Sequence, residues 1–177
     1  MRFSARKLAW SGVLIALAIV LKLPILSVPN VEFLTFVIFS SGYLLGMIEG
    51  TIIGIISMSI YTSLITPYGL PPLPIAIAQI FSMALVGFAG GLVNRFRLIL
   101  TFNSYLPYLS MGIAGLALTV IYDLLTNVAT AYVMGQFYPV MVAAIPFAAI
   151  HILSNLIIFI IFTPLLLKMS KIQHARL

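Results

Sequence analysis

Residues 31–65 read VEFLTFVIFSSGYLLGMIEGTIIGIISMSIYTSLI, and this stretch decides the fold class. Its only charged residues are Glu32 near the start and Glu49 near the middle. A transmembrane helix takes about 20 apolar residues, so the stretch is too long for a single crossing. We therefore predict two helices, over 31–47 and 50–65, which meet at a turn between Gly46 and Gly50.

The whole 177-residue chain has the same character, since 63% of its residues are hydrophobic and 7% are charged. A soluble domain carries about a quarter charged residues, so this chain has too few to cover a water-exposed surface. The composition excludes a soluble monomer, a disordered chain and an ordinary cytosolic enzyme. It predicts an all-α integral membrane protein that forms one membrane domain over residues 1–177.

Apolar runs outside this stretch predict four more helices. The prolines at 67, 71, 72 and 74 break the chain after residue 65, because proline lacks the backbone N–H and clashes with the preceding helical turn. Pro146 and Pro164 are expected to kink the last helix near its ends. The prediction is a six-helix transmembrane bundle with helices over 8–27, 31–47, 50–65, 75–93, 105–127 and 140–167.

The basic residues predict the orientation of this bundle. With six crossings, eight of the nine Lys and Arg residues fall on the side that holds both termini, and Lys22 alone falls on the other. Because cytoplasmic loops carry the excess of Lys and Arg, both termini are expected in the cytoplasm of a multi-pass cell-membrane protein. The basic charge is thus explained by topology, and no nucleic-acid partner is expected.

Small residues recur at four-residue spacing, which lets helices approach closely in lipid. For the second to fourth helices we expect internal packing, at Gly42, Gly46, Gly50 and Gly54 and again at Gly87 and Gly91. The first helix carries two such pairs beside its basic start, and these could equally face another subunit. The pairs are Ala5 with Ala9 and Gly12 with Ala16.

Polar side chains inside the predicted helices gather toward the outer half of the bundle. One stripe follows the fifth helix, where Tyr122, Asp123 and Asn127 share a face by their spacing. His151 and Asn155 share a face of the sixth helix. Polar and ionisable groups in a membrane usually mark a functional site, although they can also satisfy one another as interhelical bonds. The candidate substrate-binding residues are Glu32, Tyr61, Tyr68, Gln79, Tyr122, Asp123, Asn127, His151 and Asn155.

These residue types favour a small heterocyclic or amine-bearing ligand. Asp123 suits a cationic group, the amides and His151 suit the polar edge of a ring, and the tyrosines can stack on it. Glu32 can instead pair with Lys22 across the outer loop. The sequence has no cysteine and shows no metal-binding, phosphate-binding or nucleophile motif. We expect neither a cofactor nor catalysis, and any energy source must be a partner.

Three stretches resemble the substrate-binding membrane subunit, or S component, of energy-coupling factor (ECF) vitamin transporters. They are PNVE at 29–32 followed by GYLLG at 42–46, YGLPPLPIAIAQ at 68–79 leading to GFAGGL at 87–92, and IYDLLTN at 121–127. The resemblance that these stretches carry extends over nearly the whole chain. The resemblance implies a six-helix bundle that captures a vitamin or related small molecule from outside.

The resemblance also implies partners. The family docks through small residues of the first helix onto a transmembrane coupling subunit that sits on two ATPases. The matching positions here are Ala5, Ala9, Gly12 and Ala16. The main alternative is a structural membrane scaffold similar to the rod-shape-determining proteins, which have no ligand cavity. An intramembrane enzyme is the least favoured alternative, because no acid–base pair occurs at short spacing.

Overall fold

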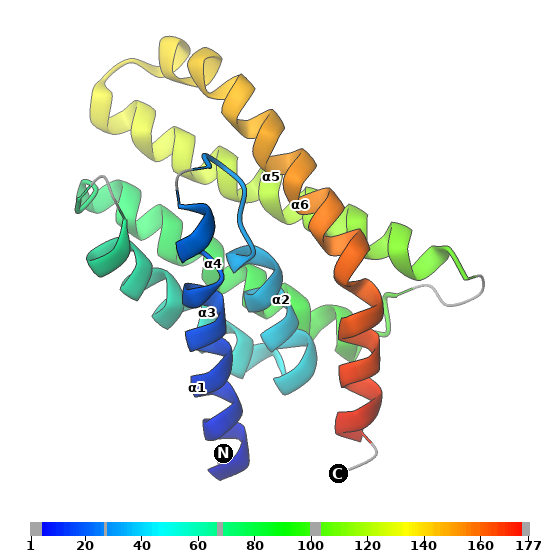
Figure 1. Cartoon of the computed structure of the whole chain (residues 1–177). Helices are drawn as coiled ribbons and strands as arrows, with labels where there is room; N and C mark the ends of the chain where they lie inside the picture. Colours follow the sequence, from blue (N-terminus) through cyan, green and yellow to red (C-terminus); the bar gives the residue numbers. More distant parts are fainter. Residues whose placement is uncertain (1–4, 27, 67–68, 100–103, 175–177) are drawn as a thin grey trace.

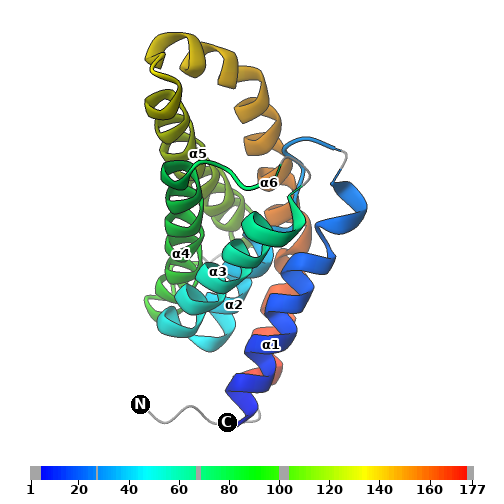
Figure 2. The ribbon, with the colours of Figure 1, turned by 90° about the vertical axis from the view of Figure 1, so that its left-hand side faces the viewer.

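The computed structural model describes residues 5–26, 28–66, 69–99 and 104–174, and this part of the chain is all-helical. It contains six α-helices, whose arrangement is shown in Figures 1 and 2. They are α1 (Ala5–Val20), α2 (Leu34–Leu45), α3 (Met47–Ile60), α4 (Leu73–Arg95), α5 (Leu106–Met134) and α6 (Phe137–His174). A short 3₁₀ turn, η1 (Leu23–Ile25), follows α1, and a π-helical turn, η2 (Tyr61–Ile65), ends α3.

Five segments are long and apolar enough to cross a membrane: Ala5–Ile25, Met47–Ile65, Leu73–Arg95, Leu106–Met134 and Phe137–Ile172. The sixth helix, α2, has 12 residues and a length of about 18 Å, against the ~30 Å thickness of a bilayer's hydrocarbon core. All of its residues except Leu44 are buried. It packs against α1, α3, α4 and α6, and is thus the central helix of the bundle.

The turn predicted inside residues 31–65 is confirmed and lies at Gly46. This glycine ends α2 and precedes α3 with φ of +119°, a conformation that side-chain-bearing residues rarely adopt. The first of the two helices begins at Leu34, three residues later than predicted. The delay follows from Pro29 and from Asn30, whose φ of +59° lies in the left-handed region and turns the chain before it can enter the helix.

The glycines of α2, α3 and α4 pack against one another, as predicted. A methyl group added to Gly87 would overlap the backbone carbonyl of Gly50, and one added to Gly42 would overlap that of Gly87. Each helix thus approaches the next at backbone distance, which only glycine permits.

The last two helices are longer than predicted. The sequence suggested helices over 105–127 and 140–167. In the structure only Gly135 and Gln136 connect α5 to α6. Gly135 is in the left-handed conformation typical of a helix end. Pro146 and Pro164 lie inside α6. The helix changes direction along its length, as expected of a proline-containing helix (Figures 1 and 2).

The two ends of the helical chain lie together. The start of α1 and the end of α6 are at the same end of the bundle (Figures 1 and 2). Lys7 of α1 pairs with Glu49 at the start of α3, and the Asn94 side chain at the end of α4 donates a hydrogen bond to the Tyr43 carbonyl near the end of α2. This end of the bundle therefore also holds the α2–α3 turn and the end of α4.

Candidate small-molecule site

A polar cavity of about 430 Å³ lies between the α1–α2 loop and helices α4, α5 and α6. This volume falls within the ~300–1,000 Å³ range of small-molecule sites. The cavity is lined by Pro29, Asn30, Ile75, Gln79, Tyr122, Asp123, Thr126, Asn127, Thr130, Ala144, Phe147, Ala148 and His151.

The cavity lies toward the end of the bundle opposite the chain ends. Asp123 is about 26 Å along α5 from Leu106, and about 17 Å from Met134, at 1.5 Å rise per residue. The α1–α2 loop, which supplies Pro29 and Asn30, also lies away from the chain ends.

Five of the nine predicted binding residues line this cavity: Gln79, Tyr122, Asp123, Asn127 and His151. The stripe on α5 supplies three of them, as its helical spacing predicted. Tyr68 lies outside the described residues. The other three predicted residues, Glu32, Tyr61 and Asn155, are not among the residues that line the cavity.

Glu32 and His151 belong to a buried row of charged side chains that begins at the cavity. Lys22 Nζ lies 2.8 Å from Glu32 Oε2, and Glu32 Oε1 lies 3.5 Å from His151 Nε2. On its other side, His151 Nδ1 lies 2.8 Å from Asp123 Oδ1. Lys22, Glu32 and His151 are 8%, 7% and 4% exposed. The imidazole ring thus connects the carboxylate at the cavity to the ion pair at the end of α1.

Glu32 is held as a carboxylate in this surrounding. Burial alone would raise the pKa of Glu32, but the Lys22 ammonium and the neighbouring His151 hold it well below its usual value. The Thr35 hydroxyl donates a further hydrogen bond of 2.7 Å to Glu32 Oε1. The pairing of Glu32 with Lys22, raised from the sequence as an alternative to ligand binding, is therefore present.

Tyr61 and Asn155 contact this row of charged side chains from outside the cavity. Lys22 Nζ lies 5.4 Å from the centre of the Tyr61 ring, within range of a cation–π contact. The Asn155 side chain donates to the His151 carbonyl one turn before it on α6. The edge-to-face contact of Tyr122 with the His151 ring, at 5.6 Å between centroids, fixes the imidazole from the cavity side.

The charges within this row of side chains balance when His151 is protonated. An imidazolium carries a proton on both ring nitrogens, so Nδ1 donates to Asp123 while Nε2 forms an ion pair with Glu32 at 3.5 Å, too long for a good hydrogen bond. Two positive groups then face two negative ones. A neutral imidazole leaves one net negative charge beside the cavity. In either state the Asp123 carboxylate lines the cavity as a hydrogen-bond acceptor.

One carboxylate oxygen is left for a ligand. Asp123 Oδ2 is buried and has no hydrogen-bond partner among the described residues. Such an atom is costly to bury, by roughly 1–3 kcal/mol or more for a charged group, so a partner is expected. Gln79, which also lines the cavity, accepts a 3.3 Å hydrogen bond from Thr62 Oγ1 at its Oε1, and its amide N–H groups have no partner among the described residues.

The loop before α2 closes one edge of the cavity, which the sequence analysis did not predict. The Asn30 side chain donates to the Phe147 carbonyl at 3.0 Å, while the Ser154 hydroxyl donates to the Asn30 carbonyl at 2.9 Å. Both contacts fix the loop to α6. The only local signal was the Pro29-Asn30 pair, since asparagine tolerates the left-handed conformation found here.

Some other hydroxyls inside the helices bond to their own backbone. Ser82 and Thr119 donate to carbonyls one turn earlier in their own helices, at 2.7 and 2.8 Å.

Among the described residues, no group of three His, Cys, Asp or Glu side chains is arranged to hold a metal ion. His151 lies between Glu32 and Asp123, with one ring nitrogen toward each, so the three side chains do not converge on a common point.

Comparison with known proteins finds no matching family model, no matching curated protein and no matching solved structure.

Proposed function

We propose that this chain captures a vitamin-like small molecule from outside the cell, as the membrane subunit of an ECF-type importer. The observation that carries the proposal is the 430 Å³ polar cavity, where a buried carboxylate oxygen of Asp123 has no hydrogen-bond partner among the described residues. A scaffold protein has no use for such a cavity. Under this proposal the chain hydrolyses no ATP itself, and the energy comes from two partner ATPases through a coupling subunit.

The chemistry of the cavity restricts the ligand. Asp123 Oδ2 accepts a hydrogen bond, and the Gln79 amide can donate one. We therefore expect a heterocycle with an N–H or amine group at one edge and an acceptor atom at the other. Tyr122, which lines the same cavity, offers an aromatic ring for stacking.

The exchange of Asp123 for asparagine should weaken ligand binding by about 10- to 150-fold. The variant keeps the size of the side chain but removes its charge, and a hydrogen bond to a charged group contributes about 1.5–3 kcal/mol. The measurement is calorimetry with the small molecule that co-purifies with the wild type. An unchanged affinity with a lowered melting temperature would make Asp123 only a structural partner of His151.

The small residues of α1 fit the partner-docking role that the resemblance implies. Ala5, Ala9, Gly12 and Ala16 lie on one face of α1 and are exposed. No atom would lie within 4 Å of a methyl group added to Gly12, whereas the glycines of α2–α4 are tightly enclosed. A stripe of small residues left open on the bundle surface is suited to close approach by another helix.

Gly12→Leu and Ala16→Trp should abolish complex formation and uptake, while ligand binding by the isolated subunit stays intact. Affinity purification of the tagged chain from its native membranes should recover a coupling subunit and two ATPases with the wild type only. If ligand binding is lost together with the complex, these residues belong to the folded interior and the docking role is wrong.

The orientation proposed for the bundle places both chain ends in the cytoplasm after six crossings. It is supported by the basic residues near the end of the bundle that holds the start of α1 and the end of α6, including Arg6, Lys7, Arg95 and Lys171. Reporter fusions after Arg97 and after Leu177 should report cytoplasm, and one inserted in the 66–74 loop should report the outside. A C-terminus outside the cell would refute the six-crossing topology.

A further inference from the structure

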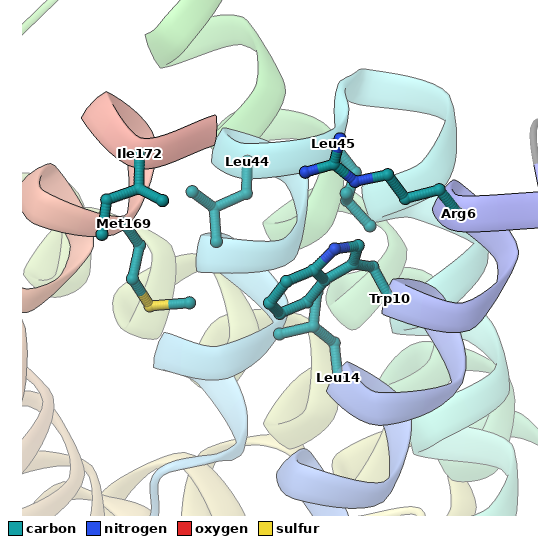
Figure 3. Close-up of a pocket in the computed structure, with 7 residues that line it drawn as sticks. All are labelled: Arg6, Trp10, Leu14, Leu44, Leu45, Met169 and Ile172. Carbon is teal, nitrogen blue, oxygen red and sulfur yellow. The ribbon is translucent and has the colours of Figure 1, made fainter. Parts of the chain in front are cut away.

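An apolar furrow, separate from the polar cavity, lies between α1 and α6, at the end of the bundle that holds the chain ends. Its wider part, of about 190 Å³, is lined by Arg6, Trp10, Leu14, Leu44, Leu45, Met169 and Ile172. Figure 3 shows Arg6 and Trp10 of α1 on one side, Met169 and Ile172 of α6 on the other, and Leu44 of α2 between them. The furrow thus has two helical walls and a floor formed by the end of α2.

The furrow continues inward along α2. A smaller cavity, of about 70 Å³, shares the lining residues Leu14, Leu44 and Met169 with the first. It reaches Phe36, Val37 and Ser40. The space exists because α1 packs mainly on α2 and α3, while α6 packs mainly on α5 and α2. The two helices therefore leave a furrow between them above the floor.

The furrow has one charged group at its mouth and one unsatisfied polar group inside. Arg6 is exposed and has no hydrogen-bond or ion-pair partner among the described residues. The Ser40 hydroxyl, further along the floor, is buried and likewise has no partner in the described part of the chain. All other lining residues are apolar or aromatic.

We propose that this furrow is a binding site for an anionic phospholipid. The headgroup phosphate pairs with Arg6, one acyl chain lies along Trp10, Leu44 and Met169, and a lipid oxygen accepts a hydrogen bond from Ser40. Basic pockets between helices on the cytoplasmic side are suited to anionic headgroups, and tryptophan favours the membrane interface. One turn of a helix with its side chains, about 10 Å wide and 5.4 Å long, occupies roughly 420 Å³ and does not fit a cavity of 190 Å³, whereas an acyl chain is narrow.

This site is separate from the small residues of α1. By helical spacing Trp10, Leu14 and Leu17 share one face of α1, and Ala5, Ala9, Gly12 and Ala16 lie on another. The lipid site therefore stands whether or not the chain docks onto a coupling subunit, and whether or not the polar cavity binds a vitamin-like molecule.

Trp10 is the only tryptophan of the chain and lines the furrow, so its fluorescence reports on lipid bound at this position. The experiment reconstitutes the full chain in phosphatidylcholine vesicles that contain, at equal mole fraction, either brominated phosphatidylglycerol or brominated phosphatidylcholine. Bromine quenches tryptophan only at close range. We expect brominated phosphatidylglycerol to quench Trp10 with an apparent binding constant about fivefold higher than that of brominated phosphatidylcholine.

Arg6→Gln should remove this preference, Arg6→Lys should keep most of it, and Arg95→Gln, the matched control, should leave it unchanged. Arg95 is exposed at the end of α4 and does not line the furrow. Equal quenching by both lipids in the wild type would overturn the proposal, as would a preference that survives Arg6→Gln. Quenching by neither lipid would mean that protein covers the furrow, from a second copy or another subunit, and would also overturn it.

Discussion

Replacement of Lys22 by methionine should lower the free energy of unfolding by about 3–5 kcal/mol. Lys22 and Glu32 are both more than nine-tenths buried, and the loss of one member of a buried ion pair leaves the other charge without compensation. The effect should extend to the cavity, because Glu32 also faces His151, which holds Asp123. Reversible denaturation in mixed micelles gives the free energy of unfolding.

A second variant separates the buried charge from the loss of the lysine side chain. Lys22→Met combined with Glu32→Gln should recover much of the stability, since glutamine keeps an acceptor for Thr35 and carries no charge. Lys7→Met is the matched control. The Lys7 side chain is 43% exposed in its pair with Glu49, and exposed ion pairs contribute about 0–1 kcal/mol. Equal losses in Lys7→Met and Lys22→Met would show that burial does not distinguish the two pairs.

Replacement of Gly87 by leucine should prevent the bundle from folding. Even a single methyl group at this position would overlap the Gly50 carbonyl, and the contact is between two backbones that cannot rotate away. Relief requires α3 and α4 to separate, which would also open the packing of both helices on α2. The expected result is loss of monodisperse protein after extraction in mild detergent, measured by size-exclusion chromatography.

Gly12→Leu provides the control for this expectation. It makes the same substitution at an exposed glycine of α1 where no neighbouring atom lies within 4 Å of the added methyl. The variant should be extracted and elute like the wild type. If Gly87→Leu does the same, the three-helix glycine contact is not what brings α2, α3 and α4 together.

The sequence predicted those features that depend on local chain chemistry. The two carboxylates and the glycines of 31–65 indicated two helices and the turn at Gly46, and the structure has both. The stripe of Tyr122, Asp123 and Asn127 follows from the helical repeat alone. For this reason the side of α5 that faces the cavity could be found without coordinates.

Features that depend on contacts between distant segments could not be predicted in the same way. From the sequence, Glu32 was a candidate ligand-binding residue. In the structure its carboxylate oxygens face Lys22 and His151, and only the tertiary fold brings His151 close to Glu32. The short length of α2 follows from the left-handed Asn30, whose conformation is fixed by hydrogen bonds to α6. The apolar lining of the cavity, such as Ala144 and Ala148, looks like any other membrane-helix sequence.

Native mass spectrometry of the full chain tests most directly whether the polar cavity holds a small molecule. Protein purified from cells in rich medium should carry a bound small molecule, which Ala148→Trp loses because the indole fills the cavity that Ala148 lines. Ala16→Trp, which adds the same ring on the exposed face of α1, should keep it. A wild-type protein without any bound molecule, or one that Ala148→Trp retains equally well, would contradict the account.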